Sequence, residues 1–128
     1  MIRFLSKKLV LAIHDRQIRL YGGDPSILDE ARLDSALTHP KWQWRYNHAS
    51  IIEMAAGYGY HICQNHAFMK GNKRTAGFSM LTFLERNGLQ VIATSGDAYE
   101  KMIAVADGRM SEKQLAEWLE TVTVPKSK

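Results

Sequence analysis

A chain of 128 residues with 45% hydrophobic and 23% charged side chains has the composition of one globular domain. Its single cysteine excludes a disulfide framework and a cysteine-rich zinc site, and no stretch approaches the ~20 apolar residues of a membrane span. The formal charge of +4 is compatible with an acidic partner or a polyanionic ligand, but it does not require nucleic acid.

The N-terminal residues place their basic pair after a short apolar run, which is not the pattern of a signal peptide, so we expect a cytoplasmic protein. The first predicted helix begins at a cap on Ser6 and ends near Tyr21, before two glycines. A second, short helix is predicted from a capping box at Ser26 and Asp29 to residues 39–40, where a proline favours a stop.

An aromatic stretch follows, in which Trp42, Trp44 and Tyr46 alternate with polar side chains. A period of two is typical of an extended strand. Two roles stay open from this pattern alone. The aromatic rings either pack onto the core or form a dedicated binding face.

The two most apolar segments occupy the middle of the chain. Ser50 and Glu53 form a capping box that opens a long helix through Cys63, a residue expected to be a packed small hydrophobe. Gly57 and Gly59 on this helix predict a close approach by a neighbouring helix. A second apolar helix is predicted from about residue 72 to a stop at residues 87–88.

The rest of the chain predicts a short extended connector at residues 89–92 and two helices, capped by boxes at residues 97–100 and 111–114. The fold class is therefore all-α, with the two apolar helices in the middle and amphipathic helices around them. We expect residues 1–122 to form the domain and residues 123–128 to be a flexible tail.

The loop between the two apolar helices carries the chemistry. His66 precedes three basic side chains, Lys70, Lys73 and Arg74, and no acidic residue lies between positions 53 and 85. Cations are disfavoured at the positive end of a helix dipole. Free backbone N–H groups and basic side chains there predict a bound anion, most simply phosphate, although the cations could also simply point into water.

Two classes of function fit a basic helix start. A helix-turn-helix would present this helix to DNA, but a recognition helix needs a polar face over several turns, and Phe78, Phe83 and their apolar neighbours do not provide one. The other class is an enzyme acting on a nucleoside phosphate, in which His66 takes a proton from an attacking hydroxyl group. The loop supplies the positioning and charge neutralisation that phosphoryl or nucleotidyl transfer needs.

Residues 66–76 resemble the signature of the Fic/Doc superfamily, His-x-Phe-x-acid-Gly/Ala-Asn-Gly/Lys-Arg. Lys73, followed by Thr-Ala, is similar to the death-on-curing (Doc) toxin branch. Residues 13–23, residues 33–37 and Pro40 are also Doc-like, so the resemblance covers most of the chain. It implies a single-domain, Fic-type helical bundle with a short extended flap over the site.

The resemblance also implies roles for individual residues. His66 is the general base and Phe68 anchors the loop in the core. The target-binding flap corresponds to Trp42, Trp44 and Tyr46. The nucleotide phosphates are bound by Gly71, Asn72, Lys73 and Arg74.

The implied activity is that of a toxin kinase, which transfers the γ-phosphate of ATP to a hydroxyl side chain of a protein such as elongation factor Tu. A Fic-type transfer of AMP is the alternative. The implied partners are a cognate antitoxin and the protein substrate, with neither DNA nor a membrane bound directly.

One position departs from the family pattern. The superfamily usually has Asp or Glu where this chain has Lys70, and that carboxylate binds Mg²⁺. An ammonium group does not coordinate the ion, so we assign no metal ligand and leave the need for Mg²⁺ open. Lys70 replaces part of the charge of the metal, or phosphates and water hold the ion, or the protein is catalytically weak and acts by binding.

Overall fold

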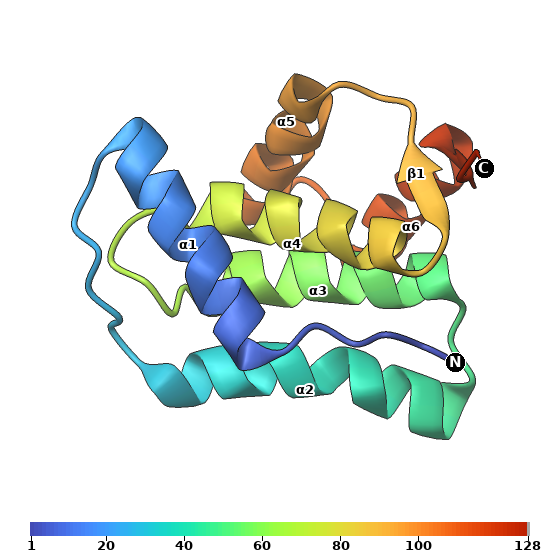
Figure 1. Cartoon of the computed structure of the whole chain (residues 1–128), viewed down its shortest axis with the longest axis horizontal. Helices are drawn as coiled ribbons and strands as arrows, with labels where there is room; N and C mark the ends of the chain where they lie inside the picture. Colours follow the sequence, from blue (N-terminus) through green and yellow to red (C-terminus); the bar gives the residue numbers. More distant parts are fainter. Residues whose placement is uncertain (128) are drawn as a thin grey trace.

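The computed structural model describes residues 1–127 and shows a mostly α-helical protein (Figure 1), which confirms the predicted fold class. It also contains a small two-stranded sheet that was not predicted. Within residues 1–127 the elements follow one another as α1 (Lys7–Tyr21), α2 (Glu30–Asn47), α3 (Ile51–Asn65), α4 (Asn72–Arg86), β1 (Leu89–Val91), α5 (Ser95–Ala106), α6 (Glu112–Val122) and β2 (Thr123–Pro125). None of these helices combines the length and the apolar character that crossing a bilayer requires.

Helices α3 and α4 lie side by side in the centre of the molecule (Figure 1), which confirms the prediction from their apolar sequences. Helix α3 packs against α2, α4, α5 and α6, and α4 packs against α1 and α5. A Cβ atom on Gly59 would lie 2.8 Å from the sulfur of Met80. The absence of a side chain at this position therefore lets the two central helices approach closely.

Three helices begin at the predicted cap residue, and two others begin at a different cap residue. Ser6, Ser50 and Ser111 cap α1, α3 and α6, the last two with complete capping boxes. Helix α2 begins at Glu30 with Asp29 as its cap, later than predicted. Helix α5 is capped by Thr94, because the predicted cap residue Asp97 instead bonds back to the Thr94 backbone N–H.

The predicted extended segment at residues 41–46 is wrong, because α2 continues through it. The helix passes Pro40, whose side chain is buried on the same face as Leu33 and Leu37. Burial of this continuous apolar stripe outweighs the backbone hydrogen bond that a proline removes. The period-two aromatic pattern has a helical explanation, since Trp42 and Tyr46 are one turn apart and their ring centroids lie 4.8 Å from each other.

Residues 123–125 of the predicted tail are paired with another part of the fold. They form β2, which pairs antiparallel with β1 in a register that places Leu89 opposite Pro125 and Val91 opposite Thr123. The extended connector predicted at residues 89–92 supplies the partner strand, so the backbone groups of the C-terminal segment are satisfied by a strand far away in sequence. Lys128, the end of the predicted tail, lies outside the described residues.

Candidate functional site

The loop at residues 66–71 joins the two central helices, and a left-handed residue stands at each end of it. His66 ends α3 with a φ of 49°, and Gly71 precedes α4 with a φ of 85°. The His66 side chain is exposed, and no hydrogen bond within residues 1–127 uses its ring. His48 ends α2 in the same left-handed conformation, which histidine adopts more readily than most residues, so this geometry reflects helix termination. The ring of His66 is open to solvent.

Phe68 anchors the loop in the core, as the family resemblance implies. Its side chain is fully buried and stacks on the ring of His14, with centroids 3.7 Å apart and planes 10° from parallel. His14 Nε2 donates a hydrogen bond of 2.8 Å to the carbonyl oxygen of Lys70. This buried histidine of α1 therefore fixes the loop from outside.

Asn72 holds the backbone of the loop. Its side-chain nitrogen donates to the carbonyl oxygen of Phe68 at 2.7 Å, and its side-chain oxygen accepts from the Phe68 N–H at 3.1 Å. The residue is buried and stands at the first position of α4. The structure gives Asn72 this bracing role, and phosphate binding by its side chain stays a prediction.

Arg74 lies between two aromatic rings. Its guanidinium carbon is 3.7 Å from the ring centroid of Tyr21 and 4.2 Å from that of Tyr99. Contact with both rings restricts the position of the guanidinium group, and cation–π contacts leave its N–H groups available for hydrogen bonds. No hydrogen bond or ion pair within residues 1–127 uses those groups.

A cavity of about 270 Å³ opens beside Arg74. Lys73 and Arg74 contribute its positive charge, and the remaining wall is mainly apolar or aromatic, with Phe78 and Leu81 from α4 and Tyr99 from α5. An apolar cavity with a few polar groups at one end is typical of sites for small organic ligands. This one runs along α4 from Lys73 to Leu81, against the first turns of α5. Its two cations favour an anion, and His66, Gly71 and Asn72 are not among its lining residues.

The segment that lies along the loop is the one preceding α2. Ile27 forms a β-bridge with Phe68, the Leu28 N–H donates to the Ala67 carbonyl at 2.7 Å, and the Met69 N–H donates to the Ser26 carbonyl at 3.0 Å. In Figure 1 this connection between α1 and α2 runs beside the loop between α3 and α4. The extended backbone at the site therefore comes from residues 26–28.

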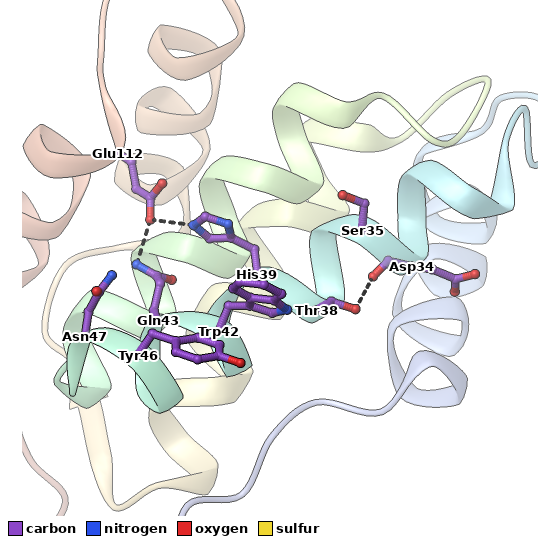
Figure 2. A pocket seen from close by; sticks show the side chains of 9 residues that line it. All are labelled: Asp34, Ser35, Thr38, His39, Trp42, Gln43, Tyr46, Asn47 and Glu112. Atoms are coloured by element: carbon purple, nitrogen blue, oxygen red, sulfur yellow. Dashed lines mark hydrogen bonds and ion pairs between the residues drawn. The ribbon is translucent and has the colours of Figure 1, made fainter.

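The predicted flap residues occupy a different place. Trp42, Trp44 and Tyr46 are exposed on the second half of α2, which points away from the loop at residues 66–71 (Figure 1). The prediction that this stretch lies extended over the site is wrong. Trp42 and Tyr46 instead line a groove of about 720 Å³ along α2, called the α2 groove below (Figure 2). Target binding by these three side chains stays a prediction.

The loop does not fit a divalent metal ion. Lys70 is exposed, and its carbonyl oxygen is already bonded to His14. The other ionisable groups of residues 66–75 are His66, Lys73 and Arg74, and Mg²⁺ prefers carboxylate and phosphate oxygens. The chain provides positive charge where a carboxylate would be needed, so no step of a reaction is assigned to a metal here.

Comparison with known proteins finds a matching family and two similar proteins. The family described as "Fic/DOC family" matches residues 4–84, which run from before α1 to the end of the buried part of α4 and include the whole loop. The chain is 32% identical over 119 residues to "Protein kinase doc" of Escherichia phage P1, covering 92% of this chain and 94% of that protein. It is 34% identical over 76 residues to "Toxin Doc" of Mycolicibacterium smegmatis, covering 57% and 58% of the two chains.

Proposed function

Because this chain belongs to the Fic/DOC family, we propose that it is a Doc-like toxin that transfers the γ-phosphate of ATP to a hydroxyl side chain of a target protein. The expected target is elongation factor Tu. The names of the two relatives, a protein kinase and a toxin, support both parts of this proposal.

One observation carries the proposal. The stacked guanidinium of Arg74 and the ammonium of Lys73 stand at the start of α4, beside a cavity with apolar and aromatic walls. A nucleoside triphosphate has matching chemistry, with an apolar base at one end and a chain of anionic oxygens at the other. The base would occupy the cavity, and the phosphates would lie against the cations and the helix N-terminus.

The proposed reaction uses His66 as the base. Its imidazole takes the proton from the target hydroxyl group as that oxygen attacks the γ-phosphorus of ATP. The new O–P bond forms while the bond between the γ-phosphorus and the β,γ-bridging oxygen breaks, and ADP leaves with the negative charge. Lys73 and Arg74 stabilise the charge that develops on the transferred group and on the leaving oxygen.

Lys70 decides how strong the activity is. In the absence of a metal-binding carboxylate, the cations of the loop are the groups that neutralise the phosphates. We propose that Lys70 provides part of this charge, so that the reaction depends less on Mg²⁺ than in relatives with an acid at this position. A protein that binds ATP without turning it over is the second candidate, because the substitution at Lys70 is the observation that favours it.

The decisive experiment follows the label from ATP to protein. Purified chain is incubated with elongation factor Tu and with ATP labelled at either the α or the γ position, with and without Mg²⁺. Label arriving only from the γ position supports phosphate transfer. Label arriving from the α position supports the Fic-type transfer of AMP instead, and ATP binding without transfer under any condition supports the second candidate.

A matched pair of histidine variants controls this experiment. His66 and His48 both end helices in the left-handed conformation, with φ values of 49° and 50°, and both are exposed. Asparagine tolerates this conformation, so His66→Asn and His48→Asn preserve the backbone equally. We expect transfer to be lost only in His66→Asn. Equal activity of both variants would exclude His66 as the base.

Arg74→Lys tests the aromatic sandwich separately. Lysine keeps the charge but lacks the planar group that stacks between Tyr21 and Tyr99 and presents two N–H groups in one plane. We expect the Kd for ATP, measured by isothermal titration calorimetry, to rise about tenfold. An unchanged Kd would mean that the nucleotide binds elsewhere.

The proposed activity has consequences for location and regulation. A toxin acting on elongation factor Tu works in the cytoplasm and needs a cognate antitoxin that blocks its site. Co-expression tests this directly, because expression of the toxin alone should arrest growth and expression of the His66→Asn variant should not.

A further inference from the structure

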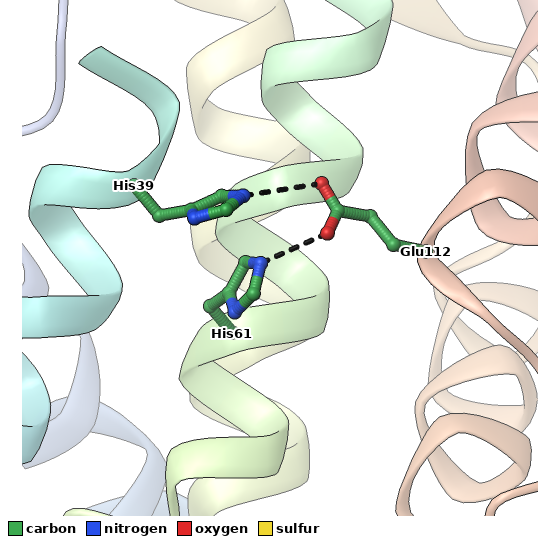
Figure 3. A group of neighbouring side chains, drawn as sticks. All are labelled: His39, His61 and Glu112. Atoms are coloured by element: carbon green, nitrogen blue, oxygen red, sulfur yellow. Dashed lines mark hydrogen bonds and ion pairs between the residues drawn. The ribbon is translucent and has the colours of Figure 1, made fainter. Parts of the chain in front are cut away.

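A cluster of three side chains lies apart from the loop and takes no part in the proposed reaction. His39 comes from α2, His61 from α3 and Glu112 from the first position of α6. Figure 3 shows both rings turned towards the carboxylate. His61 Nε2 lies 2.8 Å from one carboxylate oxygen of Glu112, and His39 Nε2 lies 3.7 Å from the other.

The geometry of the cluster is close to that of a metal site. One nitrogen or oxygen atom from each of the three residues lies within 4.8 Å of the other two. In a tetrahedral zinc site with bonds of ~2.0–2.1 Å, neighbouring ligand atoms are about 3.3 Å apart. The two separations from Glu112, 2.8 and 3.7 Å, lie on either side of this value. The three ligand atoms are therefore close enough for small side-chain rotations to bring them around one ion.

The carboxylate is also held from a second side. Gln43 lies one turn after His39 on α2, and its side-chain nitrogen donates to Glu112 Oε2 at 2.9 Å. Figure 2 shows His39 and Gln43 approaching Glu112 together. Such outer contacts orient a metal ligand and are common around metal sites. Glu112 is 26% exposed and His61 is 22% exposed, so the cluster is partly screened from water but reachable.

The ligand types select the kind of ion. Two imidazoles and one carboxylate suit Zn²⁺ and its neighbours among the divalent transition metals, whereas Mg²⁺ and Ca²⁺ prefer sites made of oxygen atoms alone. The two rings also lie close together, with centroids 3.7 Å apart. One imidazole would be enough to form a hydrogen bond with the carboxylate of Glu112. An ion bound by all three residues explains why both rings point towards that carboxylate.

We propose that His39, His61 and Glu112 form a binding site for a divalent transition metal ion, Zn²⁺ in the first instance. Each neutral imidazole binds through Nε2 with its single proton on Nδ1, so the hydrogen bond between His61 Nε2 and Glu112 is replaced by bonds from both residues to the ion. His39 and Glu112 also line the α2 groove, and a water molecule from the groove completes the coordination.

The ion would link three helices that are far apart in sequence. Because Glu112 is the first residue of α6, the site fixes the start of the C-terminal helix against α2 and α3. The consequence is a protein whose stability depends on metal, since a ligand that binds the folded state alone stabilises it. At a hundredfold excess of Zn²⁺ over its Kd, the Tm of a chain of this length should rise by roughly 10 °C.

The test uses the full chain, freed of metal with a chelator and dialysed. Zn²⁺ is titrated by isothermal titration calorimetry, and Co²⁺ is added separately to record its visible absorption, which reports a site of low coordination number. We expect one ion per chain. The affinity should fall at least 100-fold in His39→Ala, His61→Ala and Glu112→Gln, with loss of the Co²⁺ signal.

His48→Asn is the matched control, because it removes an exposed histidine at the end of α2 that lies outside the cluster. Glu112→Gln keeps the shape of the side chain and thereby guards against a loss of folding, which circular dichroism checks. Absence of saturable Zn²⁺ binding would overturn the proposal. So would binding that persists in all three cluster variants or that disappears in His48→Asn.

Discussion

The loop at residues 66–75 and the cluster of His39, His61 and Glu112 share helix α3 but differ in how they are built. His61 belongs to the last turns of α3 and His66 ends it, yet the side chains around the two histidines carry opposite charge. The loop gathers cations and has no carboxylate, whereas the cluster joins imidazoles to a carboxylate. One helix therefore carries a candidate site for an anion at its end and a candidate site for a cation beside it.

The two regions also differ in where their residues come from. The loop residues are contiguous in sequence, so their spacing is visible without a structure. The cluster is assembled from three helices, and His61 and Glu112 are 51 positions apart. A candidate site within one segment could be recognised from the sequence. A candidate site assembled by helix packing could not.

The largest expected effect is a loss of one proposed function, phosphate transfer or Zn²⁺ binding, without loss of the other. His66→Asn should lower the rate of phosphate transfer by on the order of 10²–10⁴-fold, because it removes the proposed base. The Kd for Zn²⁺ should be unchanged in this variant. Conversely, Glu112→Gln should lose the metal and keep the transfer rate within about twofold of the wild-type rate in chelator. Transfer assays and calorimetry on both variants measure this. A parallel loss of both functions in either variant would contradict two independent sites.

The next effect concerns how firmly each region is attached to the core. Phe68→Ala removes a fully buried ring, so the free energy of unfolding should fall by about 3–5 kcal/mol. Phe78→Ala is the matched control, because this ring is 41% exposed and its loss should cost about 1 kcal/mol or less. Urea denaturation followed by circular dichroism measures both. Equal losses would show that Phe68 does not anchor the loop.

Cys63 provides a reporter between the two regions. It lies on α3 between His61 and His66, and burial raises the pKa of its thiol to about 11, against a partial lowering by Lys73. The ordinary pKa is 9.0, so at pH 8 the reactive thiolate is roughly 100-fold rarer in the folded protein than in the unfolded chain.

Alkylation by iodoacetamide at pH 8, followed by mass spectrometry, should therefore be at least roughly 100-fold slower in buffer than in urea. The sign follows from burial, which disfavours the charged thiolate. Phe68→Ala should speed up the reaction because it loosens the loop end of α3, and Glu112→Gln should not. Rapid alkylation of the native wild type would mean that this part of α3 is open.

Sequence reasoning recovered the parts of the fold that are encoded locally. The capping boxes at Ser50 and Ser111 and the glycine at position 59 specify helix starts and a close approach through short-range geometry. Sequence reasoning failed where contacts between distant segments determine the secondary structure. Helix α2 continues past Pro40, which normally stops a helix, because Pro40 is buried in the core. Strand β2 forms because β1 pairs with it.

The same division holds for the candidate site. His66, Lys73 and Arg74 were predictable because the motif is contiguous, and the structure places the two cations beside a cavity. The hydrogen bond from His14 to the loop and the β-bridge of Ile27 were not predictable. Each joins residues that are far apart in sequence, so no local pattern indicates it.

The smallest expected effect tests whether the cluster contributes to stability without metal. In chelator, Glu112→Gln should lower the free energy of unfolding by about 0.5–1 kcal/mol, since a partly exposed carboxylate that is hydrogen-bonded to an imidazole contributes little. The side-chain amide that this substitution introduces still accepts a hydrogen bond, which keeps the loss small. Urea denaturation with an unchanged m-value measures the difference.

Adding Zn²⁺ turns this small effect into a diagnostic one. The wild type should gain stability with increasing Zn²⁺, whereas Glu112→Gln should gain little, so the gap between them widens with the logarithm of the metal concentration. His66→Asn should follow the wild type, because the loop supplies no ligand to the ion. A gap that stays constant as Zn²⁺ is added would assign the cluster to ion pairing alone, and α3 would then carry one ligand site rather than two.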